Sequence, residues 1–339
     1  MRFFVVGAGA TIEECHRSGN RGEKQFPTIN DFPSHWMKMA DTRAITFGCA
    51  IYLDEHGITY NKKELELLTG KINSATSDEL ENGPFEVLQK ISLDDPINHN
   101  IEKIYEFLWN KLHLDSPDIL RGFIEHSIFV PIYLRQLENF HSSSGGRWKH
   151  LKVAEIICSK LSKEDKVINL NYDTVFEIGL KQNGFKLDYS PNPNDNGIYI
   201  YKPHGSLNLL VNKELEAFKF IEPDGLPGTV HFPEPKGGTW YPVEGIVPPR
   251  LNKSSKEHPI MREILKSVRS RLPEGIILWG VGFTNSDLDL NKIYKFANIH
   301  SKRVEIINPD DNAYYRAKAI FGDNVIHYTS LDSWANNNN

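Results

Sequence analysis

The stretch VINLNYDTVFE, from Val167 to Glu177, is the most informative part of this sequence about fold. An apolar, β-prone run ends abruptly on the polar residues Asn171 and Asp173, and a helical pattern follows. Further along, YKPHGSLN shows the same change from an apolar run to a polar turn, and it carries His204. Ligands of open α/β sheets bind at the carboxyl ends of the strands. The two segments therefore predict a crevice that contains an amide, a carboxylate and an imidazole.

The chain opens with a third segment of this kind, RFFVVGAGAT, in which an apolar strand runs into a glycine-containing turn. Glycine has no Cβ, so backbone N–H groups and a helix N-terminus can approach a pyrophosphate there. The third glycine of the dehydrogenase fingerprint is missing, because Ile12 stands in its place. No second strand ending in a ribose-binding acid follows, which disfavours a hydride-transfer domain.

From residue 166 onward, strands alternate with helices, as they do in parallel α/β sheets. Strands are expected at 166–170, 198–203, 276–281, 303–307 and 324–328. Helices are expected at 174–183, 259–271, 286–298 and 312–321. Residues 222–250 are rich in proline and glycine and are expected to form a long loop or a small hairpin insert. The pattern predicts an α/β fold with a Rossmann-like parallel sheet, helices on both faces and a helical insertion.

The insertion is indicated by a mostly helical pattern between the opening strand and residue 165. Apolar residues in Ile101–Leu112 recur at the spacing of one helix face. The segment DILRGFIEHSIFVPIYLRQLENF is expected to form a longer helix with a kink near Pro131. The expected organisation is a nucleotide-binding domain at 1–35 plus 165–335, a helical insertion at 36–164 and a disordered tail at 336–339.

Composition narrows the class of protein. The 339 residues are 40% hydrophobic and 24% charged, which is typical of a soluble globular protein. A net charge of -5 gives no electrostatic reason to expect direct nucleic-acid binding. The longest apolar stretch, Ile276–Phe283, is too short to span a bilayer, and no signal peptide fits the first residues. The three cysteines form no CxxC pair and the histidines are dispersed, so we expect no metal site and a cytoplasmic location.

Each polar turn also has a purely structural interpretation. Asp173 could cap the helix that follows it, and His204 could be a buried histidine with satisfied hydrogen bonds. The glycines at 7–9 could serve only the turn. Two later strand ends, WGVGFTNSDLD at 279–289 and IINPDDN at 306–312, could face a ribose or phosphate, or their polar residues could cap helices.

Taken in order, these motifs resemble those of the sirtuin superfamily, and in particular its bacterial sirtuin-like branch found in anti-phage defence systems. The resemblance covers the two ends of the Rossmann-like domain and excludes the helical insertion. The motifs that carry it are GAGAT at 7–11, INDF at 29–32, NYD at 171–173, KPHGS at 202–206, GIVPPRLNK at 245–253, GVGFTNSDLD at 280–289 and IIN at 306–308.

The resemblance implies that NAD is bound as a substrate. It implies catalytic roles for Asn171, beside the nicotinamide ribose, and for His204, as the base. The implied NAD-binding residues are Gly7, Ala8, Gly9, Ala10 and Thr11 at the pyrophosphate and adjoining ribose, Asp31 and Phe32 in the INDF motif, Asp173 near the carboxamide, and Gly282, Phe283 and Asn308 on the adenosine side.

Two departures from the family pattern bear on the reaction. Protein deacylases of the superfamily carry a four-cysteine zinc module, which three cysteines cannot form, and an arginine where this chain has Pro33. Both favour NAD hydrolysis over lysine deacylation, and a non-catalytic NAD or ADP-ribose sensor is the remaining alternative. The family analogy further implies a homo-oligomer or a partner such as a HerA-like ATPase or an Argonaute-type protein, no membrane association, and a role as an abortive-infection effector.

Overall fold

The computed structural model describes residues 1–21, 25–29, 31–36, 39, 42–63, 85–91, 100–142, 146–189, 197–214, 216–225, 232–234, 238–251, 253, 259–269, 273–283, 290–291, 294–295 and 303–338. The chain divides into two compact units. The first comprises residues 1–26, 133–247 and 253–339, and the second comprises 27–132 and 248–252. Residues 133–164, which the sequence assigned to the insertion, group here with the first unit. The boundaries of independently folding domains stay a prediction.

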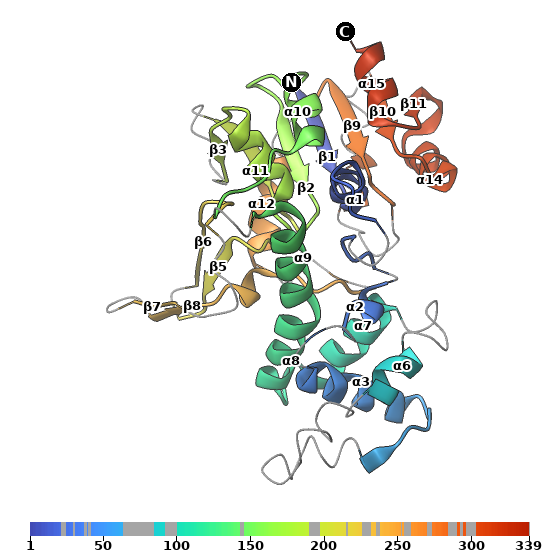
Figure 1. The fold of residues 1–339 in the computed structure, drawn as a ribbon, viewed down its shortest axis with the longest axis vertical. Coiled ribbons are helices and arrows are strands. Elements are labelled where there is room, and N and C mark those ends of the chain that lie inside the picture. The colour runs from blue at the N-terminus through green and yellow to red at the C-terminus, as the bar shows by residue number, and fades with distance from the viewer. Residues whose placement is uncertain are drawn as a thin grey trace. The chain divides into compact units, whose positions relative to one another are not determined.

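The first unit contains a seven-stranded sheet in which every pair of neighbouring strands is parallel (Figure 1). Its order is β11-β10-β9-β1-β2-β4-β3. The strands are β1 (Arg2–Val6), β2 (Lys166–Asn169), β3 (Leu187–Asp188), β4 (Ile198–Tyr201), β9 (Gly275–Trp279), β10 (Arg303–Ile307) and β11 (Val325–Tyr328). Central parallel strands are covered on both faces, which explains why they appear in the sequence as apolar runs. The predicted parallel α/β sheet is confirmed.

Helices cover both faces of this sheet. They are α1 (Ala8–Arg17), α10 (Lys152–Cys158), α11 (Val175–Gln182), α12 (Pro259–Arg269), α14 (Asp311–Phe321) and α15 (Leu331–Asn337). Side chains alternate between the faces of a strand. Phe3 and Val5 of β1 belong to one core cluster with residues of α12 and α14, whereas Phe4 meets Trp334 of α15 edge-on. The predicted helix at 286–298 falls largely outside the described residues.

The strand order reverses direction between β1 and β9. Strand β1 is followed along the chain by α1. It pairs with β2 on one side and with β9 on the other. The crevice at such a switch point is where open α/β sheets bind ligands, because the connections leave the strand ends in opposite directions. The polar turns predicted from the sequence follow β1, β2, β4 and β9, and they therefore lie at this edge of the sheet.

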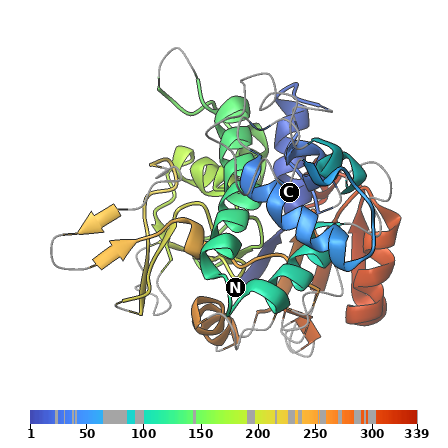
Figure 2. The same ribbon diagram turned by 90° about the horizontal axis from the view of Figure 1, so that it is seen from below.

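Two small antiparallel hairpins follow β4. The first pairs β5 (Leu209–Asn212) with β6 (Ala217–Phe220), and the second pairs β7 (Phe232–Glu234) with β8 (Gly238–Trp240). Figure 2 shows the arrows of β7 and β8 side by side. The second hairpin lies within 222–250, so the hairpin alternative for this segment describes it better than the loop. A short 3₁₀ turn at Val243–Gly245 then leads to Ile246, which forms an isolated bridge with Gly205.

The second unit is helical. Its elements are α2 (Phe32–Trp36), α3 (Arg43–Glu55), α6 (Phe85–Gln89), α7 (Ile101–Leu112), α8 (Pro117–Ile124) and a π-helical turn at Glu125–Phe129. Helix α9 (Val130–Phe140) follows directly. The apolar face predicted for α7 is buried, with Ile101, Ile104 and Leu108 fully inaccessible.

A π-helical turn at Glu125–Phe129 directly precedes α9, close to Pro131, where the sequence predicts a kink. Proline has no N–H, so the carbonyl of Ser127 loses its usual intrahelical donor. The indole Nε1 of Trp36 donates a hydrogen bond to that carbonyl at 3.0 Å instead. A single π turn inside a helix shifts the hydrogen-bond register by one residue.

The C-terminal segment differs from its prediction as a disordered tail. Helix α15 continues to Asn337, and Ser330 caps its start by accepting a hydrogen bond from the N–H of Ser333. Trp334 is fully buried and donates to the carboxylate of Glu305 at 2.6 Å, which fixes the helix to β10. Leu331 of the same helix is also fully buried, so apolar contacts that precede 336–339 hold α15 in place. Among the helices described, none is long and apolar enough to cross a membrane.

Candidate active site

The ends of β1 and β2 are joined by the side chain of Asn171. Its Nδ2 donates to the carbonyl of Gly7 at 3.0 Å and to the hydroxyl of Thr11 at 3.1 Å. Gly7 follows β1 and Thr11 lies in the first turns of α1, so one amide connects three segments at the switch point. Asn171 is 7% exposed. Both hydrogens of its amide are used within the protein, and its Oδ1 is the atom that can accept from a ligand.

The glycines after β1 pack against the turn after β9. A Cβ on Gly9 would lie 2.8 Å from the Cα of Gly280, and a Cβ on Gly7 would meet the Gly280 carbonyl carbon at 2.9 Å. The N–H of Gly9 donates to the carbonyl of Gly280 at 3.1 Å, and that of Ala10 donates to the carbonyl of Gly7 at 3.0 Å. These glycines therefore allow two turns to approach each other. The predicted role of these glycines in holding pyrophosphate stays a prediction. The same holds for Ala8, which is exposed at the start of α1.

Thr11 also connects α1 to Asp173. Its hydroxyl donates to the Asp173 carboxyl, at 3.2 Å to Oδ1 and 3.0 Å to Oδ2, and it accepts from Asn171. The N–H of Val175 donates to Asp173 Oδ1 at 3.0 Å. Asp173 thus satisfies an N–H at the start of α11, as its structural interpretation predicted, although the N-cap position itself is Thr174.

Burial raises the pKa of Asp173 from 3.8 to about 6, because desolvation disfavours the anion. The nearby ammonium of Lys202 lowers that pKa and the carboxylate of Glu177 raises it, with smaller contributions. Asp173 is 4% exposed. It therefore changes charge near neutral pH, which is uncommon for a carboxylic acid and is typical of functional sites.

His204 is fixed beside the same turn. Its Nδ1 lies 3.1 Å from the carbonyl of Leu170, the residue that precedes Asn171. A carbonyl only accepts, so Nδ1 carries the hydrogen, and in the neutral ring the basic lone pair is on Nε2. The ring of Tyr172 lies 6.5 Å from that of His204, centroid to centroid. This tautomer is the one required of a general base that acts through Nε2.

The backbone around His204 is held by the segment that follows the hairpins. The N–H of Val247 donates to the carbonyl of His204 at 2.9 Å, and the hydroxyl of Tyr172 donates to the carbonyl of Val247 at 2.8 Å. Gly205 has a φ of +83°, and the backbone of Gly245 leaves no room for a Cβ there. The KPHGS and NYD turns and the segment at 245–247 are thus connected by hydrogen bonds.

A buried ion pair lies beneath the NYD turn, and sequence reasoning did not single it out. The Nζ of Lys202 lies 2.9 Å from Oε1 of Glu177, with both side chains 0% exposed. Glu177 also accepts two hydrogen bonds from Nδ2 of Asn169, each at 3.0 Å. All three residues stand inside the quoted motifs. The sequence feature that could have indicated this ion pair is one charged residue in each of two otherwise apolar segments, VFEIGL and IYIYK.

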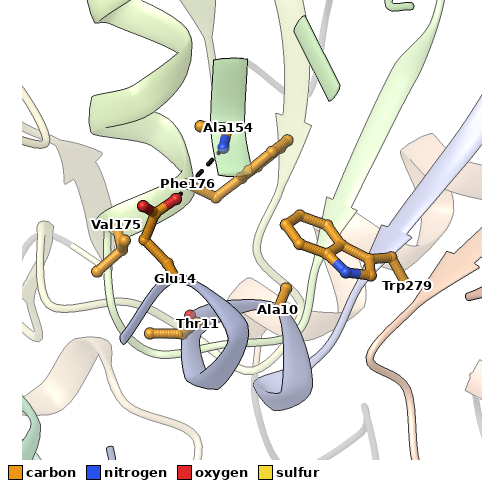
Figure 3. A pocket seen from close by; sticks show the side chains of 7 residues that line it. All are labelled: Ala10, Thr11, Glu14, Ala154, Val175, Phe176 and Trp279. Atoms are coloured by element: carbon orange, nitrogen blue, oxygen red, sulfur yellow. Dashed lines mark hydrogen bonds between the residues drawn. The ribbon is translucent and has the colours of Figure 1, made fainter. Parts of the chain in front are cut away.

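A small pocket adjoins Thr11 on the α1 side of the sheet (Figure 3). Its lining residues are Ala10, Thr11, Glu14, Ala154, Val175, Phe176 and Trp279. The carboxylate of Glu14 accepts hydrogen bonds from three successive N–H groups at the start of α10, at 3.0, 2.8 and 3.3 Å. Burial raises the pKa of Glu14, and these hydrogen bonds oppose the rise. Sequence reasoning missed Glu14, whose role depends on a helix far along the chain.

The residues predicted on the adenosine side have structural partners of their own. Phe283 has a φ of +54° and packs against Tyr294 and Phe321 in the core. Nδ2 of Asn308 donates to the carbonyl of Val281 at 3.1 Å, while its Oδ1 accepts from the N–H of Asp310 at 2.9 Å. These contacts join the turns after β9 and β10.

Gly282, also predicted on the adenosine side, lies in the turn after β9. Its carbonyl accepts a hydrogen bond from Arg316 at 3.0 Å, and a Cβ on it would meet no atom within 4 Å. A role of Gly282, Phe283 or Asn308 in binding adenosine stays a prediction.

Asp31 and Phe32 belong to the second unit. The carboxylate of Asp31 accepts hydrogen bonds from the N–H and the hydroxyl of Thr28, and the hydroxyl of Ser34 donates to the Asp31 carbonyl at 2.7 Å. Asp31 thus builds the turn that starts α2, and Phe32 is buried. Their predicted contribution to NAD binding stays a prediction.

The cysteines are free and buried. Burial raises the pKa of Cys15 and of Cys158 to about 12 and raises that of Cys49 further, so the reactive thiolate form is disfavoured at all three. In the part of the chain that the structure describes, no group of three or more histidine, cysteine or acidic side chains is placed to hold a metal ion.

No protein-family model and no curated protein matches the sequence significantly. Among solved structures, the chain is similar to a triple mutant of a Sir2 homologue in complex with 2′-O-acetyl ADP ribose, with a TM-score of 0.40, 11% identity, and coverage of 99% of this chain and 90% of that chain. It is also similar to a complex of a Sir2 homologue with NAD, with a TM-score of 0.35, 13% identity and coverage of 99% and 87%. A structure described for the mechanism and regulation of Sir2 enzymes gives a TM-score of 0.35 and 9% identity, over 98% and 88% of the two chains. Scores this low assign no family and carry no residue's role to this chain.

Proposed function

We propose that this protein is an NAD+ glycohydrolase, which cleaves NAD+ to nicotinamide and ADP-ribose. The observation that carries the proposal is the hydrogen-bonded cluster of Thr11, Asn171 and Asp173 at the switch point of the sheet, with His204 held against the carbonyl of Leu170. Open α/β sheets bind nucleotides at this place. The sequence resemblance to sirtuin-like proteins supplies NAD as the nucleotide.

In this proposal, the crevice binds NAD+ along the ends of β1, β2, β4 and β9. The pyrophosphate lies near the start of α1, where the helix dipole favours negative charge. The nicotinamide ribose lies against Asn171, and the carboxamide lies near Asp173. The turns at Gly282 and Asn308 contribute to the adenosine side. No metal is needed, because nicotinamide is already a cationic leaving group.

The proposed chemistry uses an acceptor on Asn171 and a base on His204. The bond between the ribose anomeric carbon and the nicotinamide nitrogen breaks, and its electron pair neutralises the nicotinamide ring. Oδ1 of Asn171 accepts from a ribose hydroxyl or from the attacking water. Nε2 of His204 takes the proton of that water as its oxygen bonds to the anomeric carbon. Holding the reactants in this geometry supplies much of the rate enhancement.

A non-catalytic NAD or ADP-ribose sensor is the second candidate. Both amide hydrogens of Asn171 bond to groups of the protein itself. Only its Oδ1 can then orient the attacking water, and this favours binding without cleavage. Lysine deacylation is a weaker alternative, because three cysteines cannot form a four-cysteine zinc module and Pro33 stands where the family has arginine.

The sequence resemblance also suggests a biological setting. We infer a cytoplasmic effector that depletes NAD+ during phage infection and is kept inactive until it is activated. Oligomerisation or a partner, such as a HerA-like ATPase or an Argonaute-type protein, would provide that control. These inferences rest on family analogy.

The test is to incubate the purified protein with NAD+, alone and with candidate partners, and to measure nicotinamide and ADP-ribose. Equal release of both products supports hydrolysis. Tight binding of NAD+ or ADP-ribose without product identifies a sensor. Release that requires an acylated peptide identifies a deacylase, and neither binding nor release under any of these conditions contradicts the proposal.

A further inference from the structure

The buried charges beneath the NYD turn form a closed set of contacts around it. The N–H of Asn171 donates to Oδ1 of Asn169 at 3.0 Å, and Nδ2 of Asn169 donates to Glu177. Glu177 pairs with Lys202, whose Nζ also donates to the backbone carbonyl of Asp173 at 2.7 Å. Both ends of the turn are therefore held by side chains of one set, Asn169–Glu177–Lys202.

Stability alone does not explain this set. Removing two charges from water costs several kcal/mol per ion, and replacing a buried ion pair by apolar residues is often neutral or stabilising. What such a pair provides is direction, because each hydrogen bond has a preferred geometry, and a fully satisfied polar network favours a single arrangement. Here the hydrogen bonds end on the backbone of Asn171 and Asp173.

The set also fixes the two catalytic strand ends relative to each other. Lys202 directly follows β4 and lies two residues before His204, whereas Glu177 and Asn169 belong to α11 and β2. The ion pair thus connects the segment that carries the proposed base to the segment that carries Asn171. A change in this pair would move the imidazole and the amide apart without touching either.

We propose that Asn169, Glu177 and Lys202 are positioning residues for the reaction, and that Lys202 sets the placement of Asn171 relative to His204. This inference rests on the proposed NAD+ glycohydrolase activity. It adds residues that contact neither substrate nor reacting atoms and act only through the NYD and KPHGS turns.

The test compares Lys202→Met, Glu177→Gln and the double variant in the full-length protein. Lys202→Met leaves Glu177 buried without its cation, so a loss of stability is expected. The double variant has no uncompensated buried charge and is expected to regain most of that stability. Its turn still lacks the hydrogen bond from Lys202 to the Asp173 carbonyl, so activity is expected to stay low.

The expected kinetic result is a kcat about 100-fold below wild type in both Lys202 variants, since small misplacements of reacting groups have effects of this size. KM for NAD+ is expected to change by less than about threefold, because uniform binding is kept. Lys181→Met is the matched control, since Lys181 lies on the same helix α11 and pairs with Glu222 at the surface. It is expected to leave kcat, KM and stability unchanged.

A double variant that regains both stability and kcat would overturn the inference, because the set would then serve only the fold. If the Lys202 variants do not fold, the same changes in kcat and KM are measured for Glu177→Gln. This substitution keeps the shape of the side chain and weakens its interaction with Lys202.

A second measurement separates failure of this inference from failure of the proposed function. If the wild-type protein releases no nicotinamide, the activity is wrong, and amide hydrogen exchange at Asn171 then decides the inference. Exchange about tenfold faster than wild type in the folded double variant, at matched global stability, supports a role in holding the turn. Unchanged exchange at Asn171 would refute it.

Discussion

Replacing Asp173 by asparagine should change how the stability of the protein depends on pH. In the folded protein, burial raises the pKa of this carboxyl from 3.8 to about 6, despite the nearby Lys202 ammonium. Between about pH 4 and pH 6 the unfolded chain has lost a proton that the folded protein retains. The contribution of Asp173 to stability therefore falls as pH rises through this window and is constant above it.

The magnitude follows from the shift of about two pKa units, which corresponds to about 3 kcal/mol of the free energy of unfolding. Asparagine keeps an oxygen that can accept from Thr11 and Val175 and cannot ionise. The free energy of unfolding of Asp173→Asn minus that of wild type should thus increase by about 3 kcal/mol between pH 4 and pH 7.

The assay is urea denaturation of both proteins across this pH range, with the free energies extrapolated to water. Asp165→Asn is a control with a different window. Burial acts to raise the pKa of Asp165, but hydrogen bonds from Arg2 and Ser162 together lower it below 3.8. Asp165 therefore stabilises the fold above its unfolded pKa and loses this effect only as pH falls below about 4. Its variant should show no pH-dependent difference from wild type between pH 4 and pH 7.

Two outcomes would refute the reasoning about Asp173. A difference between Asp173→Asn and wild type that does not vary with pH would show that Asp173 does not titrate in this range. A difference that increases as pH falls below about 4 would show that Lys202 outweighs burial and keeps the carboxylate ionised.

Four further predictions concern the proposed activity and its scaffold. His204→Ala should lower nicotinamide release by about 10² to 10⁴ while the protein stays folded; unchanged release would remove the imidazole from the mechanism. Activity should survive exhaustive chelation by EDTA, and loss that added zinc or magnesium restores would contradict a metal-free reaction. Gly9→Val should lower the melting temperature, because its Cβ would lie 2.8 Å from Gly280 Cα, whereas Gly282→Ala, with open space around its Cβ, should not. Asn171→Ala should reduce kcat more than NAD affinity; lost stability with retained turnover would make NYD a structural turn only.

The sheet could be predicted from the sequence because its strands are covered on both faces. FFVV, VIN, IYIY and IILW appear as apolar runs, and each polar turn marks a carboxyl end. The same logic placed Asn171, Asp173 and His204 at one edge of the sheet, where the structure joins them through Thr11 and Leu170.

Roles that depend on distant partners could not be predicted in this way. The packing of Gly7 and Gly9 against Gly280 is one example, because the GAGAT motif alone does not show which backbone lies beside it. Glu14 caps α10, and Trp334 anchors α15 through Glu305, over separations that no local pattern encodes.

The hydrogen bonds of this site restrict what it can do. Thr11 and the Asn171 amide hydrogens hold the strand ends together, so in the proposed reaction they act by fixing geometry. In the proposed reaction, Oδ1 of Asn171 serves as the acceptor and the imidazole of His204 serves as the base. An acceptor and a base suit the attack of water on a substrate that brings its own leaving-group charge, as NAD+ does.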